Sequence, residues 1–477
     1  MIQFGRLYFS ILGFILIAGY TTFVFSNLTS YPGLWLDEGF KMQLARNFAE
    51  TGKVVIQFEP GQFEYSVHNA STGWPVAVSL GLFFKIFGVS FATARTFAAL
   101  VLVAFLIAVW FLVKNKWGNG VALGAIALLT TYAPLYVNGK MVLAELPGLL
   151  FLALGFLFLG SEVGPPRGGP TSGKFIIPSI FFGLFVATKL SFVATFLPAL
   201  VLGHIWALYK RQVNWRELVL PWITIVLLVV PTIFMSLSSN LSGAELANPY
   251  GQASFLSGVL SNLKLFLTHS TLWHLLLLAL VVSWQVLAEW RKGNQNWLIV
   301  TLTSYGLLVV SYWLLSPAVF RYLLPLALML LILLPVVLLE TSFSRKTGFL
   351  LIALLIIAQG YHFATSASIS HGSDYLKFEQ YMRDNPFESG KSVGIINSAF
   401  APVLVPLDNM FQFVRIDAIT EGKHPLANPD NLPDYLIYEI DNFDKDIVPY
   451  LPILEARYRK KADFEQVFIW QQIEEDT

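Results

Sequence analysis

The chain has 477 residues, of which 55% are hydrophobic and 13% are charged, and its mean hydropathy is +0.62. This composition is typical of an integral membrane protein. The formal net charge of +1 gives no reason to expect a nucleic-acid partner. Because the chain has no cysteine, a disulfide, a thiol nucleophile and a cysteine-based metal site are all excluded.

Apolar segments at or near spanning length recur along the chain and predict about eleven transmembrane helices, because a helix satisfies its own backbone groups in hydrocarbon. These segments are Leu7–Phe25, Phe91–Val113, Gly120–Val137, Met141–Leu159, Phe175–Thr188, Leu190–Tyr209, Leu218–Ser238, Thr271–Ala288, Trp297–Leu315, Tyr322–Leu339 and Gly348–Ala364. Lysine and arginine gather on alternate connections, such as those with Lys116 and Arg291. We therefore expect those loops and the N-terminus to be cytoplasmic.

The first outer loop, residues 26–90, is too long to be a simple connector and is expected to be functional. Phe40, Leu44 and Phe48 recur in it at helical spacing with charged residues between them, which predicts a helix lying on the membrane surface. The apolar stretch that begins at Trp74 and ends near Phe87 is short for a span, so we expect an interfacial or re-entrant helix there.

The chain divides into an expected transmembrane domain, residues 1–364, and an expected soluble domain, residues 365–477, on the outer side of the membrane. The second part predicts a small α/β domain, with a helix and short strands. The helix is expected at Asp374–Asn385 and the strands at Ser392–Asn397, Pro433–Ile440 and Val467–Gln472. Acceptor binding and shielding of the site are both open as roles for this domain.

Asp37 and Glu38 are adjacent carboxylates at the start of the helix predicted in the first outer loop. A carboxylate at the boundary between lipid and water can be partly desolvated, which favours its use as a general base. The structural alternative is that Asp37 caps the helix and pairs with Lys41, four residues further on.

Further charges interrupt apolar sequence on the expected outer side, where a charge is costly and marks a functional candidate. Glu145 lies where the third and fourth spans meet. Its structural alternatives are an interfacial carboxylate paired with Lys140, or a carboxylate at a helix start, just before Pro147, that complements the helix dipole. Lys189 lies at an outer turn and Arg321 at the start of a span, so either could instead extend its charge from a helix end to the interface. Cations and carboxylates on one face suit a phosphate-bearing lipid substrate.

Several short motifs occur in an order that resembles the GT-C glycosyltransferases that use polyprenyl-phosphate sugars, especially bacterial relatives of the protein O-mannosyltransferases and the lipid A aminoarabinose transferases. The resemblance covers roughly the first 340 residues. The matching segments are 36–40, 45–47, 73–75, 84–89, 94–95, 140–147, 187–189 and 320–325.

The resemblance implies a GT-C fold, a polyprenyl-phosphate-linked sugar donor and an acceptor hydroxyl on a lipid, glycan or protein. It implies that the Asp37/Glu38 pair contains the catalytic carboxylate and that Glu145 is the second acidic position. Which of Asp37 and Glu38 is the base stays open, and we choose Asp37. Lys189 and Arg321 match positions that face the lipid phosphate. The chain departs from many relatives by having Glu145 in place of aspartate and Leu190-Ser191 after the lysine.

The expected reaction is an inverting displacement, in which the deprotonated acceptor hydroxyl attacks the anomeric carbon and expels the lipid phosphate. Lys140 and His68 are weaker candidates for stabilising this phosphate. A divalent ion on Asp37, Glu38 or Glu145 is chemically possible, but we predict no essential metal or other cofactor.

The alternative function is a multi-span transporter or flippase of lipid-linked sugar. Transporters commonly carry polar residues near the bilayer midplane and have related halves. Here the charges lie at the outer boundary and the sequence has no visible repeat, which favours the enzyme.

Overall fold

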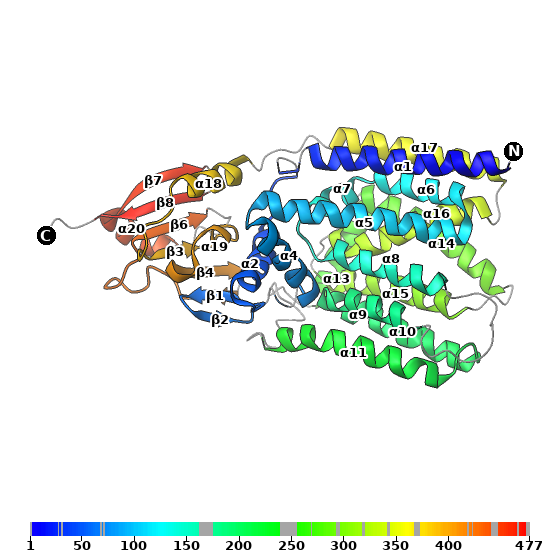
Figure 1. Cartoon of the computed structure of the whole chain (residues 1–477), viewed down its shortest axis with the longest axis horizontal. Coiled ribbons are helices and arrows are strands. Elements are labelled where there is room, and N and C mark those ends of the chain that lie inside the picture. Colours follow the sequence, from blue (N-terminus) through cyan, green and yellow to red (C-terminus); the bar gives the residue numbers. More distant parts are fainter. Residues whose placement is uncertain are drawn as a thin grey trace.

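Figure 1 shows the computed structural model of the chain, with a helical bundle at one end and a sheet domain at the other. Helices α2 (Leu36–Thr51) and α4 (Trp74–Phe87) lie between these two parts. The structure describes residues 2–26, 28–29, 32–66, 69, 72–161, 175–238, 255–268, 270–291, 296–316, 320–340, 344–366, 373–416, 419–421, 423–439, 447–464 and 467–473.

The bundle is built from long apolar helices, as the hydropathy pattern predicts. Its elements are α1 (Ile2–Ser26), α5 (Phe91–Trp117), α6 (Asn119–Thr130), α7 (Ala133–Lys140), α8 (Glu145–Ser161), α9 (Ile176–Ala187), α10 (Leu190–Tyr209), α11 (Trp215–Leu237), α13 (Phe255–Thr268), α14 (Ser270–Arg291), α15 (Trp297–Leu315), the 3-10 helix η2 (Phe320–Leu323), α16 (Leu324–Glu340) and α17 (Arg345–Ser366). Within the described ranges, 7 helices are long and apolar enough to cross a membrane, or 8 if α6 and α7 form one bent span.

Each of the segments expected to span the membrane is helical over most of its length. The spans expected beyond those 8 correspond to α8, α9 and α14, whose described apolar stretches are shorter. Helix α13 was not predicted.

Two expected spans differ from single straight helices at the end of the bundle that faces the sheet domain. The segment Gly120–Val137 is bent by 70° between α6 and α7, because Pro134 starts a new helix after an extended Tyr132. In the segment Met141–Leu159, the helix begins only at Glu145. The residues before it do not continue the helix. The backbone N–H of Val142 instead donates to the Glu38 carboxylate at 3.0 Å.

The first outer loop contains the two helices that the sequence predicts and a hairpin, β1 (Ile56–Glu59) and β2 (Gln62–Glu64). Helices α2 and α4 pack closely, because Gly81 lets the carbonyl oxygen of Ala45 approach within 2.6 Å of where a Cβ would stand. Lys41 and Arg46 are 4% and 5% exposed, so neither faces water as the charged residues of a surface helix would. The bundle and the sheet domain cover them instead.

The C-terminal part is an α/β domain, as expected. It contains α18 (Ser373–Asp384), β3 (Val393–Ile396), α19 (Ala401–Leu404), η3 (Leu407–Asn409), β4 (Met410–Ile416), β5 (Ile419–Glu421), β6 (Tyr435–Glu439), η5 (Val448–Tyr450), α20 (Leu451–Arg457), β7 (Tyr458–Phe464) and β8 (Val467–Gln472). The predicted helix and three strands correspond to α18, β3, β6 and β8, whereas β4, β5 and β7 were not predicted.

The six strands form one sheet in the order β5-β4-β3-β6-β8-β7. Strand β3 is parallel to β4 and β6, while the outer pairs are antiparallel. Every residue of β3 and β6 is buried, which explains why both strands are mainly apolar, with Glu439 at the end of β6 as the exception. The connection from β3 to β4, residues 397–409, lies against α2, as described below.

Candidate functional site

Asp37 and Glu38 lie in the first turn of α2, where carboxylates stabilise the helix dipole. The cap residue is Trp35, and its backbone N–H donates to the Glu38 carboxylate at 3.0 Å. Glu38 therefore makes this capping contact. Because neighbouring residues on a helix point about 100° apart, the two carboxylates face different surroundings.

Arg321 connects Asp37 with Glu145, although the three residues are distant in sequence. One guanidinium nitrogen of Arg321 forms an ion pair with Asp37, and its Nε lies 3.8 Å from Oε1 of Glu145. Lys189 donates to the same Glu145 oxygen at 2.5 Å. The structure thus brings together four of the residues singled out from the sequence.

Lys41 joins these residues and completes what we call the charged cluster: Asp37, Lys41, Glu145, Lys189 and Arg321. Its ammonium donates to the backbone carbonyl of Asp37 at 3.2 Å. Burial lowers the pKa of Lys41 to about 8, against the raising effect of Asp37, and Arg321 lowers it further. With three cations and two carboxylates, the charged cluster has an excess of positive charge.

A small pocket lies beside the charged cluster. It is lined by Glu145, Lys189, Ser191, Phe192, Thr195, Val309, Tyr312, Arg321, Tyr322 and Pro325. The ammonium of Lys189 lies 4.6 Å from the centre of the Tyr322 ring, and the ring of Tyr312 packs edge-on against Tyr322. The Nε of Arg321 is buried and makes no hydrogen bond within the described part of the chain, so it can donate to a bound anion.

Glu38 is placed away from this pocket, in a buried ion pair. Its two oxygens accept from Arg95 at 2.8 and 3.2 Å, and from the backbone N–H groups of Trp35 and Val142 at 3.0 Å each. The Glu38 side chain is 0% exposed. The pair joins α2 to α5 and to the segment that precedes α8.

Lys140 is not among the residues that line the pocket. Lys140, at the end of α7, donates to the hydroxyl of Tyr136 at 3.0 Å and lies over the ring of that residue. His68 falls outside the described residues.

The sequence indicates Lys41 only as a partner of Asp37 and indicates no role for Tyr322 or Arg95. The signal for Lys41 was its spacing of four residues from Asp37, which puts both side chains on one face of α2. Nothing in the local sequence could identify Arg95 as the partner of Glu38, because the two are 57 residues apart.

The carboxylates do not form a suitable cage for a divalent ion. Asp37 and Glu145 each face a cation, so a metal would have to displace Arg321 or Lys189. Over the described ranges, no three histidine, aspartate or glutamate side chains lie close enough together to hold a metal ion.

Comparison with known proteins relates the chain to others by structure. No family model matches the chain, and no curated protein matches it. The structure is similar to that of ArnT from Cupriavidus metallidurans bound to undecaprenyl phosphate, with a TM-score of 0.61 and 11% identity, covering 98% of each chain.

The structure is also similar to that of the oligosaccharyltransferase AglB from Archaeoglobus fulgidus in complex with an inhibitory peptide and a dolichol-phosphate. The TM-score is 0.56 and the identity 12%, covering 99% of this chain and 75% of that one. A complex of the Archaeoglobus fulgidus oligosaccharyltransferase with Zn and sulfate gives a TM-score of 0.57 and 12% identity, covering 96% of this chain and 73% of that one. At identities this low, the similarity shows the fold alone. The structural similarity confirms the GT-C fold that the sequence resemblance implied.

Proposed function

We propose that the chain is a membrane glycosyltransferase that moves a sugar from a polyprenyl-phosphate donor to an acceptor hydroxyl. The observation that carries this proposal is the charged cluster, whose cations exceed its carboxylates beside a pocket with aromatic walls. Such a site suits a lipid phosphate, which needs fixed cations in a poorly hydrated place. The lipid phosphates bound to ArnT and AglB support a donor of this class.

Asp37 is the proposed general base. Its side chain is 26% exposed, whereas the side chain of Glu145 is 3% exposed and that of Glu38 is 0% exposed. A base must reach the acceptor proton, and Asp37 is the most accessible of these three carboxylates. Glu145 is assigned to holding Lys189 and Arg321 in place.

The reaction is a single displacement. Asp37 takes the proton of the acceptor hydroxyl, the hydroxyl oxygen bonds to the anomeric carbon, and the bond from that carbon to the phosphate oxygen breaks with inversion. The electron pair of that bond remains on the phosphate, where Lys41, Lys189 and Arg321 stabilise the developing charge. Arg321 would turn from Asp37 towards the phosphate, which frees the carboxylate for the acceptor.

The remaining expectations become part of the same proposal. Residues 1–364 form the catalytic membrane domain, residues 365–477 form an outer domain, and the site opens on the outer face of the membrane with the N-terminus in the cytoplasm. The cations of the charged cluster provide the positive charge for the leaving phosphate, so no metal ion is assigned to the reaction. We assign no phosphate contact to Lys140.

The test compares purified wild-type protein with Asp37→Asn, using a panel of undecaprenyl-phosphate sugars and mass spectrometry of the products. We expect transfer by the wild type and a loss of about 10²–10⁴-fold in Asp37→Asn, which is the usual contribution of a positioned base. Asp384→Asn, which changes an exposed carboxylate on α18, is the matched control and should retain full activity.

The same preparations distinguish the enzyme from a flippase. Wild-type protein in vesicles that moves a lipid-linked sugar across the bilayer, without transferring the sugar, would overturn the proposal. Normal turnover by Asp37→Asn would overturn the assignment of the base.

A further inference from the structure

Helix α2 has two opposite faces. At about 100° per residue, Asp37 and Lys41 lie about 40° apart on one face. Gly39, Gln43 and Arg46 lie within about 60° of each other, and the centre of their face is about 180° from the first. The first face belongs to the charged cluster, and the second contacts the C-terminal domain.

The second face is fitted closely to that domain. A Cβ on Gly39 would overlap the carbonyl oxygen of Ala399, so only glycine permits this approach. The side-chain amide of Gln43 donates to that of Gln412 on β4 at 2.7 Å, in a fully buried contact. We call the face formed by Gly39, Gln43 and Arg46 the domain seam.

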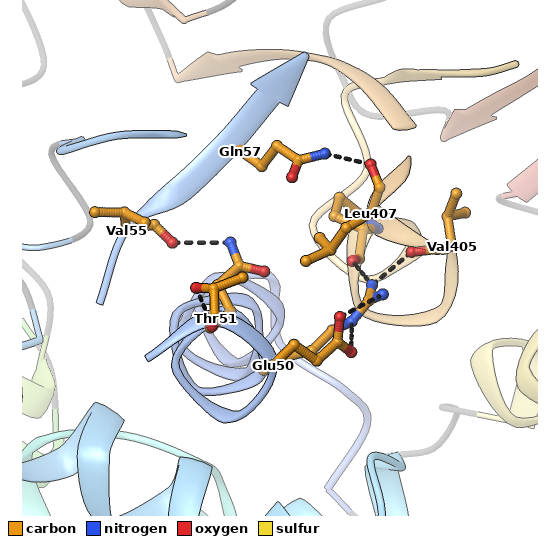
Figure 2. A network of polar contacts seen from close by, with 9 residues as sticks. Glu50, Thr51, Val55, Gln57, Val405 and Leu407 are labelled. Carbon is orange, nitrogen blue, oxygen red and sulfur yellow. Dashed lines mark hydrogen bonds and ion pairs between the residues drawn. The ribbon is translucent and has the colours of Figure 1, made fainter. Parts of the chain in front are cut away.

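Arg46 makes the strongest contacts of the domain seam. Its guanidinium donates to the carbonyl oxygens of Pro402 and Val405, both at 2.6 Å, and to Glu50 at 2.7 Å. Figure 2 shows Val405 and Leu407 facing α2 and β1 at this place. Leu407 accepts from the side chain of Gln57 on β1 at 2.5 Å, so the same connection also holds the hairpin.

The C-terminal domain is itself fixed to the bundle. The carboxylate of Glu379 on α18 accepts from the backbone N–H of Phe91 at the start of α5, at 3.2 Å. The ring of Phe91 also packs edge-on against Phe400, 5.4 Å away between ring centres. Helix α2 therefore lies between the bundle and a domain that is anchored on the bundle.

We infer that Arg46 is a positioning residue, through which the C-terminal domain sets the place of Asp37 and Lys41 against the cations of the bundle. This inference rests on the proposed function. Nine residues separate Asp37 from Arg46, or about 13 Å along the axis, so a tilt of about 10° at Arg46 moves Asp37 by about 2 Å. A misplacement of about 1 Å can cost about 10²-fold in rate.

The experiment measures the full-length purified chain by hydrogen exchange, by binding of undecaprenyl phosphate and by sugar transfer. In Arg46→Met we expect amide exchange over residues 37–43 to rise about tenfold or more, because two buried charged hydrogen bonds are lost. The kcat should fall about 10²-fold, while the affinity for undecaprenyl phosphate falls less than about tenfold, since Lys189 and Arg321 remain in place and only Lys41 moves with the helix. Arg46→Lys should recover part of the kcat.

Matched controls test whether loss of the domain seam causes the changes in amide exchange and kcat. Lys423→Met removes another cation that joins the two parts, an 85% exposed lysine paired with Glu59, and should change exchange and kcat less than about twofold. Gly39→Ala should act like Arg46→Met, whereas Gly19→Ala on α1, where an added Cβ meets nothing within 4 Å, should behave as wild type.

The outcomes separate this inference from the proposed function. Unchanged exchange over residues 37–43 in folded Arg46→Met, or an equal loss of kcat in Lys423→Met, would overturn the positioning role. If the wild type neither binds undecaprenyl phosphate nor transfers sugar, the proposed function fails, while the exchange result still decides whether the domain seam holds α2.

Discussion

The buried pair of Glu38 and Arg95 provides the sharpest test of how the two adjacent carboxylates differ. Arg95 donates to both oxygens of Glu38 and to the carbonyls of Leu28, Pro32 and Gly33, and its side chain is 1% exposed. Arg95→Met removes all of these donors and leaves a buried carboxylate without its cation. Breaking such a pair costs about 3–5 kcal/mol of the free energy of unfolding.

The size of the thermal shift follows from the length of the chain. An unfolding entropy of about 2.1 cal/mol/K per residue gives about 1 kcal/mol/K for the whole chain. A loss of about 3–5 kcal/mol should therefore lower the midpoint of thermal unfolding by about 3–5 °C. Replacing both partners, in Glu38→Leu with Arg95→Met, should recover most of this loss, because no buried charge is then left unpaired.

Thermal unfolding in detergent, followed by tryptophan fluorescence, checks this prediction. Arg345→Met is the matched control, because Arg345 is 74% exposed in its pair with Glu340, and it should shift the midpoint by less than about 1 °C. Equal shifts for Arg95→Met and Arg345→Met would refute the stability argument. A Glu38→Gln variant that keeps its stability but loses turnover would show that Glu38 is the catalytic carboxylate.

Three further predictions concern the cations of the charged cluster and the close approach at Gly73. Lys189→Met and Arg321→Met should each weaken binding of undecaprenyl phosphate by about tenfold or more, because a charged hydrogen bond contributes about 1.5–3 kcal/mol; unchanged affinity in both would remove the phosphate assignment. The pKa of Lys41 is lowered to about 8, so its charge is present below that pH and lost above it. The affinity for undecaprenyl phosphate, measured from pH 7.5 to 10, should therefore fall as the pH rises. Lys41→Arg should abolish this fall, and a pH dependence identical to that of the wild type would contradict the role of Lys41. Gly73→Ala should destabilise the protein, because a Cβ there would overlap the carbonyl oxygen of Ala187, and a midpoint equal to that of the wild type would contradict the close approach.

Much of the candidate site could be predicted because charge is costly in apolar sequence. Glu145, Lys189 and Arg321 each interrupt an apolar stretch, and the alternation of basic loops assigned them to one side. The role of Glu38 could not be predicted in this way. Adjacent carboxylates look equivalent in sequence, and only the helical rotation between them directs one to Arg95 and the other to Arg321.

The strands of the C-terminal domain could likewise be predicted from the sequence only in part. Strands β3 and β6 are buried on both faces and are mainly apolar in sequence, so the sequence predicts them. Strand β7 has exposed lysines and an arginine, and its pairing with β8 depends on backbone hydrogen bonds that leave no mark in its composition.

The sequence by itself determined that this is a multi-span membrane protein with a long loop after its first helix, because hydropathy and charge act locally over the length of one span. Only the tertiary structure decided which charges meet. Arg321 reaches Asp37 across most of the chain, and Arg46 is buried under a domain more than 350 residues away in sequence, at the carbonyl oxygen of Pro402. Such contacts depend on how the helices and the sheet domain pack, and no local pattern encodes them.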